Sequence, residues 1–138
     1  MSDAVETVRR LEEAWAASDN ETAGSLIGQG FGEHAQHLGS QGTVESMVQA
    51  NEGVRMAFPD AVRTIEDIFG EDDMAVVRVR MQGTNTGGLP WFGIPANGAK
   101  VDCQWISIYR VADGKVVEHW AQQDLPTLMT QLGARPGM

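Results

Sequence analysis

The spacing of apolar residues changes near the middle of this chain, and that change narrows the fold to one class. Up to Phe58, apolar side chains recur every three or four residues, as on one face of a helix. From Met74 to Gln82 they alternate with polar residues, as along a strand with one buried side. Helices followed by consecutive strands predict an α+β domain, with the helices packed on one side of an antiparallel sheet.

Three helices are expected before the spacing changes. Asp3 and Glu6 have the spacing of a capping box, and a helix of about four turns follows from the apolar residues Val5, Val8, Leu11 and Trp15. A shorter helix is expected over residues 21–27, ended by the loop glycines Gly28, Gly30 and Gly32. The third helix follows the N-cap residue Thr43 and stops at Pro59. Its predicted apolar face consists of Val44, Met47, Val48, Asn51, Val54 and Phe58.

Strands are expected over residues 60–69, 74–82, 101–111 and 116–123. The last two are joined by a tight turn in which Gly114 takes the position that needs a positive φ, so they form a hairpin. A final helix carries Leu125, Leu128, Met129 and Leu132 on one side, and it ends at Gly133. A long twisted sheet that curls over three helices would enclose a cavity for a small ligand.

Length and charge exclude several classes of partner. The 138 residues are enough for one hydrophobic core and too few for two, so we expect a single domain over residues 1–138. The net charge of −9 would repel nucleic acid and anionic membrane surfaces. The chain starts without an export signal and has no stretch near the roughly 20 apolar residues of a membrane span, which predicts a cytoplasmic protein. Cys103 has no partner for a disulfide, and no cysteine cluster indicates a metal site.

Four segments, in this order and spacing, resemble the SnoaL-like polyketide cyclases, also called ester cyclases. They are Ala-Phe-Pro-Asp at 57–60, the Gly- and Asn-rich stretches 83–87 and 93–98, the hairpin sequence from Tyr109 to Trp120, and Gln-Leu-Gly at 131–133. The similarity extends from Trp15 almost to the end of the chain. It implies the cone of the nuclear-transport-factor-2-like (NTF2-like) superfamily, in which a curved antiparallel sheet packs on N-terminal helices around one apolar pocket.

The resemblance also implies a function. It predicts a cofactor-free enzyme with no metal, a homodimer or homotetramer, that acts on a hydrophobic, oxygenated polyketide- or terpenoid-like substrate. The reaction would be cyclisation, isomerisation or dehydration by acid/base chemistry. The chain departs from the family pattern where the acid/base aspartate is expected, because that position holds Ala121. A hydrophobic ligand-binding or carrier domain without catalysis is therefore the alternative.

His119 is the main catalytic candidate, because histidine exchanges a proton near neutral pH. Strand alternation places Cys103, Trp105 and Ser107 on one face, with Val117, His119 and Ala121 on the matching face of the next strand. The resemblance implies that this face lines the pocket. A buried, hydrogen-bonded core histidine is the competing interpretation.

Other candidates each have a structural alternative. Asp124 is either the N-cap of the last helix or a base with a raised pKa. His34 and His37 lie in the segment expected to close the mouth of the cone, where one of them would touch substrate. The remaining expected ligand-binding residues, each with a packing or backbone role as its alternative, are Trp15, Asn51, Asn85, Trp91, Cys103, Trp105, Ser107 and Ala121.

Overall fold

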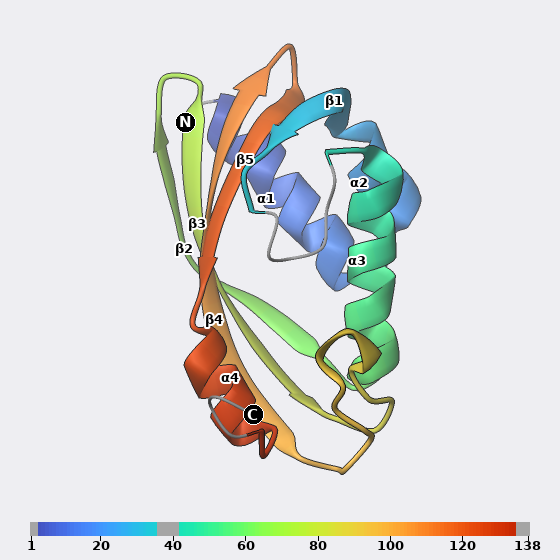
Figure 1. The fold of residues 1–138 in the computed structure, drawn as a ribbon. Helices are drawn as coiled ribbons and strands as arrows, with labels where there is room; N and C mark the ends of the chain where they lie inside the picture. Colours follow the sequence, from blue (N-terminus) through green and yellow to red (C-terminus); the bar gives the residue numbers. More distant parts are fainter. Residues whose placement is uncertain (1–2, 36–41, 135–138) are drawn as a thin grey trace.

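A computed structural model describes residues 3–35 and 42–134. Three helices come early in the chain, a five-stranded sheet provides most of the rest, and a last helix follows the final strand (Figure 1). In chain order, the elements are α1 (Asp3–Ala16), α2 (Asn20–Ser25), β1 (Ile27–Glu33), α3 (Val44–Ala57), β2 (Val62–Glu71), β3 (Met74–Thr84), the 3₁₀ turn η2 (Pro90–Phe92), β4 (Lys100–Ala112), β5 (Lys115–Gln123) and α4 (Leu125–Gln131). The expected α+β architecture is confirmed.

The sheet is mixed. Its strand order is β1-β5-β4-β3-β2, and β2 to β5 form an antiparallel meander, while β1 pairs with β5 in parallel. The segment that contains β1 was expected to be a loop because of its glycines, and that expectation was wrong. At Gly28, a Cβ atom would lie 3.3 Å from the carbonyl oxygen of Val116, so the missing side chain lets β1 approach β5 closely.

Capping fixes where the helices begin. Thr43 caps α3 in a reciprocal capping box with Ser46, and α3 ends before Pro59, as expected. Asp124 caps α4 by accepting a hydrogen bond from the Thr127 amide. The second helix is shorter than expected, since the chain leaves it at Ser25 to enter β1.

Tight turns hold the sheet together. Between β4 and β5, Asp113 and Gly114 both have positive φ, of 53° and 72°, as a type I′ hairpin turn requires. Gly87 follows β3 and passes so close to α3 that a Cβ atom would overlap the carbonyl oxygen of Met56. This close approach positions the loop after β3 against the end of α3.

Two apolar clusters lie on the helix side of the sheet. The larger cluster joins α1 and α2 to the strands, and the smaller one joins the end of α3, the loop after β3 and α4 to β3 and β4. Trp105 packs against both clusters from β4. Each large side chain buried in this way contributes about 1.5–3 kcal/mol. Across the described residues, no helix is both long and apolar enough to span a bilayer.

Candidate active site

His119 lies on the helix side of the sheet and is almost fully buried. Its Nδ1 is 2.9 Å and 3.1 Å from the two carboxylate oxygens of Glu33, at the end of β1. Its Nε2 is 3.2 Å from Oγ of Ser107 on β4. Both ring nitrogens are therefore held, and the carboxylate favours the tautomer with a proton on Nδ1. Parallel pairing of β1 with β5 sets Glu33 opposite His119 and makes the contact possible.

A second set of buried polar side chains begins at Tyr109, directly opposite His119 in the hairpin. Tyr109, the cross-strand partner of His119, stacks on the imidazole with ring centroids 4.6 Å apart. Its hydroxyl donates to Glu12 of α1 at 2.9 Å, and the other Glu12 oxygen accepts from Arg63 of β2 at 3.1 Å. Arg63 also donates to Oδ1 of Asn51 on α3 at 2.9 Å. Four elements thus contribute to one polar interior network.

Burial controls the protonation of two groups on β4. Loss of solvation raises the pKa of Tyr109 well above its usual value, and the neighbouring Glu12 carboxylate raises it further. Tyr109 is therefore a neutral hydrogen-bond donor at physiological pH. Burial likewise raises the pKa of Cys103 to about 11, with a smaller contribution from Asp102. The Cys103 thiol is consequently protonated and a poor nucleophile.

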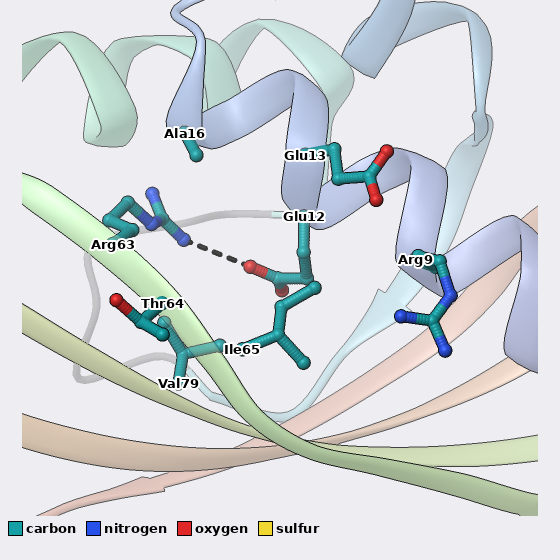
Figure 2. A pocket seen from close by; sticks show the side chains of 8 residues that line it. All are labelled: Arg9, Glu12, Glu13, Ala16, Arg63, Thr64, Ile65 and Val79. Carbon is teal, nitrogen blue, oxygen red and sulfur yellow. Dashed lines mark hydrogen bonds and ion pairs between the residues drawn. The ribbon is translucent and has the colours of Figure 1, made fainter.

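A cavity of about 310 Å³ lies between α1 and the β2 edge of the sheet (Figure 2). Figure 2 shows the Glu12 and Arg63 side chains, which both line it, pointing toward one another and joined by a hydrogen bond. The lining residues are Arg9, Glu12, Glu13, Ala16, Arg63, Thr64, Ile65 and Val79. Half of these side chains are charged, and this cavity is not lined by the expected wall residues Trp105, Ser107, His119 and Ala121. Among those four, Ser107, His119 and Ala121 are buried within the protein, whereas the resemblance implied that they line the pocket.

His34 lies away from His119. Side chains alternate along β1 and just beyond it, so Glu33 faces the helices while His34 faces outward. There it contacts Glu118 at 3.2 Å and stacks on Trp120 with centroids 4.8 Å apart. His37 lies outside the described residues.

Asp124 and Asn85 hold backbone in place. Asp124 is exposed and accepts hydrogen bonds from the amide and hydroxyl of Thr127, which lower its pKa. Asn85 is completely buried; it donates to Pro95 and Asn97 and accepts from the Gly88 amide. These are the structural alternatives weighed for both residues. Neither side chain is hydrogen-bonded to His119.

The remaining candidates occupy varied environments. Trp15 lies in the larger apolar cluster, and Cys103 lies in the smaller one. Trp91 is 54% exposed and lies against Gly53 of α3. Trp105 is half-buried, with the Arg63 guanidinium 5.0 Å from its ring centroid, a cation–π contact. Ala121 is the cross-strand partner of Ser107.

Four polar residues of this interior were absent from the sequence-based candidates: Glu12, Glu33, Arg63 and Tyr109. Glu12 carried a usable signal, because it lies four residues after Val8 and so falls on the apolar face of α1. Arg63 similarly shares a strand face with Ile65. Glu33 gave no signal, since its segment was interpreted as a loop. Within residues 3–35 and 42–134, no group of three potential ligands could hold a metal ion.

Comparison with known proteins defines the class of fold. A Catenulispora acidiphila protein with a ketosteroid isomerase-like fold matches at a TM-score of 0.75 and 13% identity, over 94% of each chain. The architecture is thus the NTF2-like one. The family model for SnoaL-like polyketide cyclases matches residues 5–132, and this chain belongs to that family. Its family points to an enzyme of polyketide-related small-molecule chemistry.

Two further solved structures are similar to this chain over nearly its whole length. AclR from Streptomyces galilaeus, proposed to be a hydroxylase, is 25% identical over 100% of this chain and 85% of its own, with a TM-score of 0.84. IdmH from Streptomyces antibioticus, proposed to be a polyketide cyclase, is 29% identical over 95% of this chain and 99% of its own, with a TM-score of 0.79. No curated protein matches significantly.

Proposed function

We propose that this protein is an enzyme that performs cofactor-free acid/base chemistry on a hydrophobic, oxygenated small molecule of polyketide or terpenoid type. The reaction is a cyclisation, isomerisation or dehydration, each of which needs a proton removed from one atom and returned to another. The observation that supports this most is the buried His119, held by Glu33 on one nitrogen and Ser107 on the other.

The arrangement suits proton exchange for electrostatic reasons. The Glu33 carboxylate stabilises the imidazolium that forms when His119 accepts a proton, and it keeps the ring in one orientation. Ser107 gives the other nitrogen a hydroxyl that both donates and accepts. Glu33 therefore takes the supporting role in this proposal, in place of Asp124, whose carboxylate is engaged by Thr127.

The test compares two histidine variants against polyketide-type ketone substrates. His119→Asn should lower turnover by about 10²- to 10⁴-fold, the usual contribution of a positioned acid/base group. His34→Asn, on the outward face, is the matched control and should stay within about twofold. Mass spectrometry of products gives the rates, and circular dichroism checks folding. Turnover within a few-fold of wild type in a folded His119→Asn protein would remove His119 from the mechanism.

A carrier domain is the second candidate, favoured by one observation. Ala121 lies opposite Ser107 on the buried face, so this position offers no carboxylate to react with a ligand. The same incubations discriminate, because a carrier returns its bound ligand unaltered whatever the residue at position 119.

Self-association is proposed through the outer face of the sheet. Val62, Phe69 and Ile106 are exposed there, at 58%, 62% and 46%, on strands β2 and β4. Covering these apolar side chains in a homodimer or homotetramer would remove them from water. Light scattering on the purified protein measures the assembly, and a monomer at all concentrations would contradict it.

A further inference from the structure

The two sets of buried polar side chains, one around His119 and one around Glu12, form one continuous series of hydrogen bonds. From one end, Glu33 contacts His119, and His119 contacts Ser107. Ser107 lies two residues from Tyr109 on the same face of β4, and its hydrogen bond to the Tyr109 hydroxyl opposes the rise in the Tyr109 pKa that burial causes. Tyr109 then donates to Glu12. A carboxylate stands at each end, and every group between them can both give and receive a proton.

Only the Glu12 end of this chain meets the described cavity. Glu12 and Arg63 line that cavity, whereas Glu33, His119, Ser107 and Tyr109 do not. Arg63 donates to Glu12 and Asn51 through its two terminal nitrogens, and its buried Nε has no partner among the described residues. A buried donor left unpaired costs about 1–3 kcal/mol, so an acceptor oxygen at this point would be stabilised.

We propose that Glu12 and Arg63 are the residues that touch the ligand, and that Tyr109 and Ser107 relay protons between Glu12 and His119. The proposal rests on the proposed function and names the end of the network at which a carbonyl-bearing ligand reacts. Glu12 is then the catalytic residue, Arg63 binds the ligand oxygen, and His119 with Glu33 stores the proton.

The proton step balances as follows. A proton on the carbon next to the ligand carbonyl moves to the Glu12 carboxylate, and the electron pair of that C–H bond remains on the ligand as an enolate. The enolate oxygen accepts a hydrogen bond from Nε of Arg63. Glu12 passes its proton to the Tyr109 oxygen, and the Tyr109 hydroxyl turns away from Glu12 to pass its own proton to Ser107. Ser107 turns toward His119 and passes its own proton to Nε2. The imidazolium formed is paired with Glu33.

Two physical features support a relay through Tyr109. Its raised pKa keeps the hydroxyl neutral, so that it transmits a proton without retaining a negative charge. Glu12 is 3% exposed and Ser107 is 1% exposed, which keeps water from competing for the proton between the two ends. The Tyr109 and His119 rings are stacked, which keeps the Glu12 end and the His119 end of the relay at a fixed distance.

The test uses 4-nitrophenol, whose ionised oxygen is a stand-in for an enolate and whose colour reports ionisation. Absorbance titration gives its dissociation constant, and ¹⁵N NMR of the ring nitrogens reports the state of His119. We expect binding to move the His119 signals in the wild type. Arg63→Gln should weaken binding about tenfold or more, because a charge-assisted hydrogen bond is lost. Arg78→Gln, an outward-facing arginine of the same sheet, should stay within about twofold.

The relay itself is tested by breaking it. Tyr109→Phe keeps the stacked ring, and Ser107→Ala breaks the chain one step later if the first variant fails to fold. Either should bind 4-nitrophenol within about threefold of wild type, a difference of roughly 0.7 kcal/mol, yet leave the His119 signals unmoved. Glu118→Gln, which removes the carboxylate beside the outward His34, is the control in which the signals still move.

Three results would overturn the proposal: no binding by the wild type, unmoved His119 signals on binding, or signals that move equally in Tyr109→Phe. If the signals stay unmoved while His119→Asn abolishes turnover, the relay fails and the proposed function stands. If the signals move but turnover survives His119→Asn, the hydrogen-bonded connection stands and His119 is removed from the mechanism of turnover.

Discussion

Strands β1 and β5 carry two glutamate–histidine pairs of opposite character. Glu33 and His119 face the helices, and their side chains are 2% and 3% exposed. His34, which follows Glu33, and Glu118, which precedes His119, face outward and are 45% and 33% exposed. Each histidine also stacks on an aromatic ring, Tyr109 inside and Trp120 outside. The chemistry is the same, and only the side of the sheet differs.

The difference shows how solvent decides the importance of a contact. Outside, water solvates both partners, and Glu118 is also bonded to Arg110, so the His34 contact is one of several. Inside, each polar atom needs a protein partner because water does not reach it. Removal of one partner of the inner pair therefore leaves the other buried and uncompensated, whereas removal of one partner of the outer pair leaves a side chain that water solvates.

Replacement of the glutamate in each pair should give the largest difference in stability between the inner and outer pairs. Glu33→Ala is expected to lower the free energy of unfolding by about 3 kcal/mol or more, because His119 then lacks its buried partner. Glu118→Ala should leave the urea midpoint nearly unchanged. Urea unfolding followed by tryptophan fluorescence measures both. Equal losses in the two variants would show that burial does not separate the pairs.

Replacement of the aromatic ring stacked on each histidine should give the second-largest difference in stability between the inner and outer pairs. Tyr109→Phe keeps its ring on His119 but removes the hydroxyl that donates to Glu12, and should lower the free energy of unfolding by about 1–3 kcal/mol. Trp120→Phe keeps a ring beside His34 and should cost less than about 1 kcal/mol. Thermal unfolding at one pH provides the measurement. A larger loss for Trp120→Phe would reverse the ranking.

The smallest expected effect is a pH-dependent contribution of Glu118, in the outer pair, to the free energy of unfolding. The hydrogen bond from Arg110, and then that from His34, lowers the pKa of Glu118 below its ordinary value of 4.5. Since the unfolded state then binds more protons, this contribution to stability is present above pH 4.5 and is lost as the pH falls through the folded-state pKa. The difference between wild type and Glu118→Gln should therefore be larger at about pH 7 than at about pH 3. A difference independent of pH would contradict it.

The sequence predicted most of the architecture for local reasons. Helical spacing and the capping residues Thr43 and Asp124 act within a few residues, so their effects are visible in the chain itself. Alternation along the strands predicted that Ser107 shares a face with Trp105, and His119 with Ala121; in the structure both Ser107 and His119 are buried. The strand β1 was missed because glycines are rare in strands, and the contact that favours them comes from Val116, almost ninety residues later.

The candidate site was predicted only in part. Alternation gives the face of a side chain but not the partner it meets, so His119 could be named while Glu33 could not. The chain from Tyr109 through Glu12 to Arg63 depends on α1 crossing the sheet at one particular place.

Local chemistry, written in the order of residues, established the class of fold, the hairpin and the buried face that carries His119. The partners of that histidine, the parallel edge strand and the charged cavity beside α1 arose only when distant segments packed together. Hydrogen bonds between side chains need atoms within about 3 Å, and such distances between remote residues are fixed by the packing of whole elements.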